Sequence, residues 1–149
     1  MLKIKKITSR NFRRYGWVIE YPGKNLCGRR NNLFRIVLRE AAKTGWRIAY
    51  LVVRDRSISR LEQHPDSFES FEPVAGKSIL FVCAGKNNDK TECFRLERPV
   101  VLKKGIWHGI ISVGRESEIK ITENSRVKCA YRSTGGDQYG RKKDIVGRR

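Results

Sequence analysis

The two histidines, His64 and His108, are the side chains in this sequence best suited to moving protons, because an imidazole titrates near neutral pH. His64 lies in the pattern Glu62-x-His64-x4-Glu69, so it has a carboxylate on either side. A carboxylate can orient an imidazole or raise its pKa. Two imidazoles with one or two carboxylates also suit a divalent transition ion. If the four side chains converge, they predict either an acid–base site or a metal site.

Strand alternation indicates which of these side chains share a face. In the apolar segment IWHGIIS, His108 points to the same side as the neighbouring aliphatic residues, so we expect it in the interior. Trp107 alternates with it and is expected to pack outside. Glu62 and His64 are two positions apart and therefore share a face. The turn that follows at residue 65 can bring Glu69 back toward them.

Short apolar segments bounded by glycine, proline and asparagine predict a chain of β-strands. Many short strands with glycine-rich turns are typical of an all-β sandwich or closed barrel. We expect one short N-terminal helix over 9–16, with Ser9 as N-cap and Gly16 just past its end. Strands are expected at 2–8, 17–21, 33–38, 46–53, 78–84, 92–97, 107–113, 118–122 and 127–132.

Length and composition predict a single barrel domain over residues 1–132, followed by a basic, flexible tail over 133–149. The formal net charge of +18 is spread along the chain, and no nucleic-acid-binding motif accompanies it, so nucleic-acid binding is not the favoured function. The apolar segments are too short for a membrane span, and the N-terminus lacks the apolar core of a signal peptide. We therefore expect a cytoplasmic protein. Its four widely spaced cysteines are expected to be reduced.

The two histidine segments also resemble the cupin signature in their spacing. They read Glu62-x-His64-x4-Glu69-x6-Gly76 and Lys103-x-Gly105-x2-His108-x3-Ser112. Glu62 takes the place of the first cupin histidine, and Lys103 replaces a proline. This resemblance implies a cupin-type double-stranded β-helix in which Glu62, His64, Glu69 and His108 converge inside the barrel.

Three longer blocks resemble the ureidoglycolate lyase family, formerly called ureidoglycolate hydrolase. They are NFRRYGWVIE at 11–20, LEQHPDSFESFEPVAGKSILFVCAG at 61–85 and KKGIWHGIISVGRESEIKIT at 103–122, and they occur in the family's order. Arg54 also stands where the family has an arginine. The neighbours of His108 and the glutamate at 69 depart from the family pattern.

The resemblance implies a lyase that releases urea and glyoxylate from ureidoglycolate. Such a reaction needs a base at the substrate hydroxyl, an acid at the departing nitrogen and a cation for the carboxylate. His64 and His108 are the expected acid and base, with Glu62 or Glu69 orienting one of them. The expected carboxylate-binding cations are Arg54, Lys103 and Lys104.

Three questions stay open at this level. The cluster of Glu62, His64, Glu69 and His108 can hold a divalent ion such as nickel, manganese, iron or zinc instead of acting by proton transfer alone. A non-catalytic cupin that binds a small anionic metabolite is the alternative to an enzyme, and a nucleic-acid-associated protein is a weaker one. A homodimer is expected, because barrels of this kind present self-complementary edges.

Overall fold

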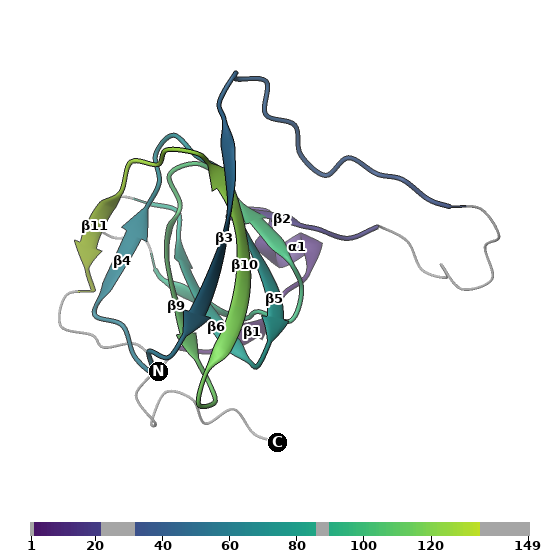
Figure 1. The fold of residues 1–149 in the computed structure, drawn as a ribbon. Helices are drawn as coiled ribbons and strands as arrows, with labels where there is room; N and C mark the ends of the chain where they lie inside the picture. The colour runs from purple at the N-terminus through teal and green to yellow at the C-terminus, as the bar shows by residue number, and fades with distance from the viewer. Residues whose placement is uncertain (1, 22–31, 86–89, 135–149) are drawn as a thin grey trace.

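The computed structural model describes residues 2–21, 32–85 and 90–134, which form two β-sheets and one short helix (Figure 1). The six-stranded sheet has the order β1-β7-β6-β9-β4-β11, and the five-stranded sheet has the order β2-β8-β5-β10-β3. In the first sheet the strands are β1 Ile4–Lys6, β7 Glu92–Arg95, β6 Ser78–Cys83, β9 Trp107–Ser112, β4 Arg60–Gln63 and β11 Ala130–Ser133. In the second they are β2 Gly16–Val18, β8 Val100–Leu102, β5 Glu69–Ala75, β10 Ser117–Asn124 and β3 Trp46–Val53.

The two sheets enclose the main hydrophobic core, which includes Phe71, Leu80, Phe94 and Ile119. Strand β6 is buried along its whole length because alternate residues serve two clusters. Leu80 belongs to the main core, whereas Phe81 belongs to a second cluster that also contains Trp107. The expected all-β barrel with a short N-terminal helix is confirmed, and Trp107 packs away from the main core as predicted.

The helix α1, Ser9–Phe12, is shorter than predicted, and its cap lies one residue earlier. Thr8 rather than Ser9 is the N-cap, and it forms a capping box with Asn11. Gly16 does not follow the helix end but opens β2. A Cβ on Gly16 would lie 1.8 Å from the carbonyl oxygen of Val101, so only glycine permits this close approach of β2 to β8.

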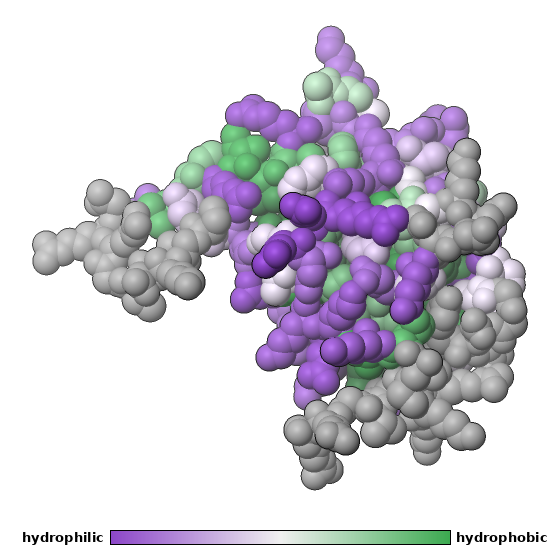
Figure 2. Space-filling model, turned by 180° about the vertical axis from the view of Figure 1, so that it is seen from behind, coloured by the Kyte–Doolittle hydropathy of each residue, from purple (hydrophilic) through white to green (hydrophobic). Residues whose placement is uncertain are grey.

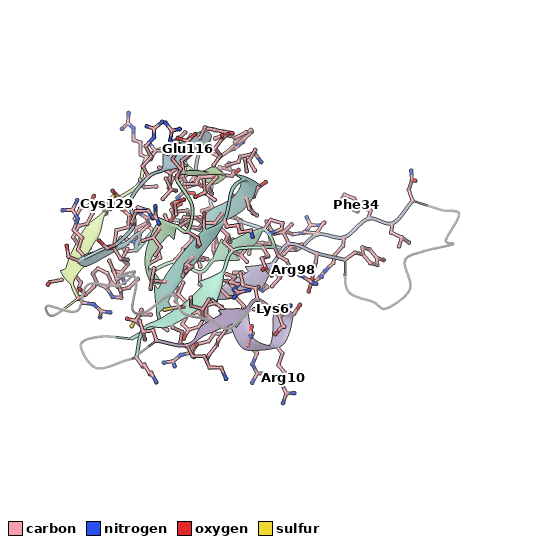
Figure 3. The ribbon with its side chains drawn as sticks, turned by 90° about the horizontal axis from the view of Figure 1, so that it is seen from below. Lys6, Arg10, Phe34, Arg98, Glu116 and Cys129 are labelled. Atoms are coloured by element: carbon pink, nitrogen blue, oxygen red, sulfur yellow. The ribbon has the colours of Figure 1, made fainter. Side chains whose placement is uncertain are left out.

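The prediction of a strand over 33–38 is wrong, because residues 32–43 form neither helix nor strand. This segment extends away from the barrel beside residues 19–21, and the side chain of Phe34 is 86% exposed (Figures 1 and 3). Its apolar residues have strand-like sequence, but within the described residues no edge pairs with them. Without a partner edge, the backbone cannot form the hydrogen bonds that define a strand.

Three strands were not predicted, namely β4, β5 and β8. Strand β5 contains two glutamates and Pro73, residues that are rare in strands. Pro73 is tolerated because the pairing between β5 and β10 changes register there. The predicted strand at 127–132 begins only at Ala130 and ends at Ser133, one residue past the expected domain boundary. Most of the predicted tail, residues 135–149, lies outside the described residues, as does Cys27.

Hydrophilic side chains cover much of the rear face of the protein, as expected for a chain with 32% charged residues (Figure 2). Cys129 is a free thiol, whereas the reduced state expected for the other cysteines stays a prediction. In the described part of the chain, no helix has the length and apolar character needed to cross a membrane.

Candidate functional site

The structure brings together the four side chains that the sequence singled out. Glu62 lies in β4 directly opposite His108 in β9, His64 follows β4, and Glu69 opens β5 on the other sheet. His108 Nε2 lies 3.0 Å from Glu69 Oε2 and 3.5 Å from Glu62 Oε1. His64 Nε2 lies 3.4 Å from the same Glu69 oxygen. Glu62, His64, Glu69 and His108 therefore form one cluster between the sheets, which we call the carboxylate–histidine cluster.

Backbone carbonyls hold both imidazoles in a fixed orientation. His108 Nδ1 lies 3.0 Å from the carbonyl oxygen of Ile106, and His64 Nδ1 lies 3.1 Å from that of Lys128. A carbonyl accepts but does not donate, so each Nδ1 carries a proton and Nε2 is the atom turned to the cluster. Gly105, with φ of +78°, forms the turn before β9 and donates its N–H to the carbonyl of His64 at 2.9 Å, which ties the two histidine segments together.

The cluster has a neighbour that the sequence analysis missed. Glu123 in β10 pairs in register with Glu69 and lies with its Oε2 4.0 Å from His64 Nε2. Only 6% of its side chain is exposed, and Arg47 in β3 donates two hydrogen bonds to its Oε1, at 2.9 and 2.7 Å. The signal was present in the sequence, because Glu123 continues the inward alternation of Ile119 and Ile121.

Burial and close charges shift the pKa values of the cluster strongly. Burial opposes ionisation of Glu69, but the adjacent imidazoles of His108 and His64 outweigh it and lower the pKa of Glu69 to about 2. Burial likewise opposes protonation of His108, but Glu62 and Glu69 raise its pKa to about 10. Glu69 also raises the pKa of His64, and His108 lowers that of Glu62. Without a metal, these shifts favour protonated imidazoles beside ionised carboxylates in the cluster.

The residues present fit a divalent cation. Glu69 Oε2 and His108 Nε2 are fully buried and lie 3.0 Å apart, yet neither makes an aligned hydrogen bond. Buried polar atoms are normally satisfied, so such atoms call for an ion or a water. Two sets of possible ligand atoms converge here, one from Glu62, His64 and His108 and one from His64, Glu69 and Glu123. Nitrogen and carboxylate oxygen donors with fixed imidazoles are typical of transition-metal sites.

A cavity of about 520 Å³ reaches the cluster from the gap between β3 and β4. Glu62 and His108 line it, together with Leu51 and Val53 from β3 and Tyr131 from β11. The side chain of Glu62 is 41% exposed, whereas that of Glu69 is 6% exposed, so Glu62 and His108 form the face that a small molecule meets. A second cavity of about 580 Å³ lies around the turn between β5 and β6 and includes no member of the cluster.

Arg54 lines the cavity but is engaged in an exposed ion pair. Its Nε donates to Glu116 Oε2 at 3.1 Å, and its side chain is 74% exposed. Glu116 lies at the periphery of the barrel (Figure 3). Arg54 is thus close enough to the cavity to reach a ligand there, but nothing in its present contacts aims it at the cluster.

The two predicted lysines are directed elsewhere in this structure. Lys103 Nζ donates to the carbonyl oxygen of Arg13 at 2.7 Å, next to the end of α1. Lys104 Nζ forms an ion pair with Glu40 at 2.5 Å. Among the described residues, neither ammonium group contacts a member of the cluster. Their role in binding a substrate carboxylate stays a prediction.

A barrel that holds two imidazoles and several carboxylates in one cluster, with Glu62 and His108 of that cluster lining a cavity, defines a small-molecule site. The chain belongs to the ureidoglycolate lyase family, whose family model matches residues 1–130. This confirms the resemblance found in the sequence.

Individual relatives are more distant. A ureidoglycolate lyase from Rhizobium etli is 24% identical over 138 residues, which cover 82% of this chain and 83% of the relative. Among solved structures, oxalate decarboxylase from Bacillus subtilis at pH 4.6 and a mutant of the same enzyme each match with a TM-score of 0.45 and 18% identity. Each match covers 61% of this chain, and the chain spans only 24% of the oxalate decarboxylase chain.

Proposed function

We propose that the protein is a ureidoglycolate lyase, which releases urea and glyoxylate from a small anionic substrate. Membership of the family supports this proposal, and one structural observation carries it. His108 and Glu62 line a cavity of about 520 Å³ at 3.5 Å from each other, backed by the buried Glu69. The cavity therefore presents a proton donor and a proton acceptor side by side.

The reaction needs two proton movements, and the cavity-facing pair can supply both. The substrate hydroxyl transfers its proton to Glu62 as the carbon–oxygen double bond forms. The carbon–nitrogen bond breaks, its electron pair goes to the ureido nitrogen, and that nitrogen takes a proton from His108 Nε2. The ring of His108 is left neutral with its proton on Nδ1, where the carbonyl of Ile106 already holds it. Glu69 stabilises the imidazolium before the transfer.

We further propose that Glu62, His64, Glu69 and His108 hold a divalent transition ion, for which manganese, nickel, iron and zinc are the candidates. The buried Glu69 Oε2 and His108 Nε2, which make no aligned hydrogen bond, support this. A bound ion would act as a Lewis acid on the hydroxyl or carboxylate of the substrate. A bound ion would engage the same Nε2 of His108 that donates the proton, so metal binding and proton donation by His108 are alternative states of the cluster.

We also propose a cytoplasmic location. The free thiol of Cys129 supports it, because thiols persist in reducing compartments.

The test is to incubate the purified chain with racemic ureidoglycolate, with and without each of the four metals, and to measure glyoxylate. We expect release that exceeds that of His108→Ala by at least 10²-fold. Equal release by the two proteins would contradict the lyase assignment. Binding of ureidoglycolate without release would favour the non-catalytic alternative.

A further inference from the structure

A row of residues on three neighbouring strands, β9, β4 and β11, faces the cavity of the candidate site (Figure 1). Glu62 in β4 lies opposite His108 in β9 on one side and opposite Tyr131 in β11 on the other. Side chains directly opposite one another project from the same face of a sheet. Arg60 lies two positions before Glu62 in β4, so it shares this face, and it also lines the cavity. The sheet therefore places a guanidinium beside the proposed acid–base pair.

The ring of Tyr131 supports the guanidinium of Arg60. The Cζ atom of Arg60 lies 4.7 Å from the centroid of this ring. The next residue, Arg132, packs on Trp107 of the second hydrophobic cluster instead, so alternation along β11 turns Tyr131 toward the cavity. A guanidinium stacked on a ring keeps the N–H donors at its edge free, and these donors match the two oxygens of a carboxylate. In the part of the chain that the structure describes, no carboxylate lies within ion-pair distance of Arg60.

The carboxylate of the substrate needs a cation that another group does not already occupy. The carboxylate–histidine cluster contains as many carboxylates as imidazoles, so it offers an anion no surplus of positive charge. Lys103 and Lys104 bind groups away from the cluster. Arg54 lines the cavity but pairs with Glu116. Arg60 lines the same cavity and stacks on a ring rather than on an anion, so its N–H donors are available to a ligand.

We propose that Arg60 binds the carboxylate of the substrate and that Tyr131 positions its guanidinium. This inference rests on the proposed function and names the residue that selects an α-hydroxy acid. In ureidoglycolate the hydroxyl, the ureido nitrogen and the carboxylate are attached to one carbon. With the hydroxyl at Glu62 and the nitrogen at His108, the carboxylate lies one bond from the reacting carbon. Residues two apart on a strand are about 6 to 7 Å apart, a distance that the long side chain of Arg60 spans.

Steady-state glyoxylate release by the full chain tests the role of Arg60. We expect Arg60→Met to raise KM for ureidoglycolate by about tenfold or more and to change kcat by less than about threefold, because a contact made equally in ground and transition states affects KM alone. Arg60→Lys keeps the charge but not the fork, so its KM should be intermediate. Arg95→Met is the matched control, since Arg95 is exposed and lines the second cavity. A parent-like KM in Arg60→Met, or a larger rise in Arg54→Met, would overturn the inference.

Titration calorimetry with glycolate separates this inference from the proposed function. Glycolate carries the hydroxyl and the carboxylate on one carbon but has no ureido group to lose, and glycolamide replaces its carboxylate with a neutral amide. With a chelator present, we expect Arg60→Met to weaken glycolate binding by about tenfold or more and to leave glycolamide binding unchanged.

The same titration tests Tyr131, whose side chain is 56% exposed and therefore tolerates truncation. Tyr131→Ala should weaken glycolate binding, whereas Tyr131→Phe keeps the ring and should retain it. Equal glycolate binding by the parent chain and Arg60→Met would overturn the inference. Glycolate binding that depends on Arg60 in a chain that releases no glyoxylate would overturn the lyase assignment and leave the carboxylate site standing.

Discussion

His108 and Glu69 lie with Nε2 and Oε2 3.0 Å apart on opposite sheets of the barrel, and neither atom makes an aligned hydrogen bond. The charges of the two side chains attract each other. Because neither atom makes an aligned hydrogen bond, both atoms can bind an ion or a water that lies between Glu62, His64 and the His108–Glu69 pair. The arrangement suits a site whose imidazoles are protonated until a ligand binds and displaces the protons. The chemistry of the cluster can be tested at each of these residues.

Glu62→Gln removes the proposed proton acceptor from the cavity while keeping its size. We expect kcat to fall by about 10²-fold with a small change in KM, because general base catalysis typically contributes that much or more. Steady-state glyoxylate release over a range of ureidoglycolate concentrations measures both constants. Glu97→Gln is the control, since Glu97 is exposed and lies at the second cavity, which includes no member of the cluster. Parent-like kcat in Glu62→Gln would exclude Glu62 as the acceptor.

Binding of a divalent ion should release protons from the cluster. The pKa of His64 and of His108 is raised in the metal-free protein, whereas an imidazole must be neutral to bind a metal. Titration calorimetry with manganese, nickel or zinc in buffers of different ionisation enthalpy counts the protons released. We expect between one and two per ion near pH 7.

His108→Ala should weaken this binding by at least tenfold and reduce the number of protons released. Arg54→Met, which leaves the cluster intact, should alter neither quantity. Binding with no proton release would mean that the ion sits elsewhere.

The stability of the metal-free protein should depend on pH in two separate ranges. The pKa of Glu69 is lowered to about 2 in the folded state, so its contribution to the unfolding free energy is complete above its ordinary value near 4.5 and is lost as the pH falls toward 2. The pKa of His108 is raised to about 10, so its contribution is complete below about 6.5 and is lost as the pH rises through 10. Urea denaturation from pH 3 to pH 10 measures both limbs.

Substitutions test whether this ion pair produces the two limbs. Glu69→Gln should flatten the acid limb, and His108→Gln should flatten the alkaline one. If Glu69→Gln loses stability on acidification as steeply as the parent chain, the ion pair between the sheets does not control the acid limb.

The sequence located the site better than it located the strands. His108 was predictable because strict alternation in β9 places it on the same side as Ile110, which packs on the main core, and His108 contacts Phe71 of that core. Strand β6 was predictable because its six residues are apolar or small and become buried on both faces. Strand β5 was not predictable, because it contains two glutamates and Pro73, which have low strand propensity. Glu69 belongs to the site, and Pro73 lies where the pairing with β10 changes register.

Long-range partners explain the remaining errors. The segment over 33–38 has a strand-like pattern, but a strand also needs an edge to pair with, and no local pattern reveals whether one is within reach. Glu123 was missed because it lies just past the strand predicted over 118–122, where a carboxylate is usually exposed. Its burial depends on Arg47, which is distant in sequence and adjacent only across the sheet.

Arg47→Met should destabilise the protein by about 1 to 3 kcal/mol, because it leaves the buried carboxylate of Glu123 without its half-exposed partner. The double variant Arg47→Met with Glu123→Met should recover most of this loss, since it also removes the buried carboxylate that the single variant leaves without a partner. Urea denaturation at pH 7 measures both variants.

Arg54→Met is the matched comparison, because it breaks the exposed ion pair between Arg54 and Glu116, for which a loss under about 1 kcal/mol is expected. Arg47 is connected to the cluster by its hydrogen bonds to Glu123, which neighbours His64. Arg47→Met should therefore change the metal affinity measured by calorimetry, whereas Arg54→Met should not. Equal stability losses in the two single variants would show that the Glu123 carboxylate reaches solvent, and Glu123 would then have no part in holding the cluster together.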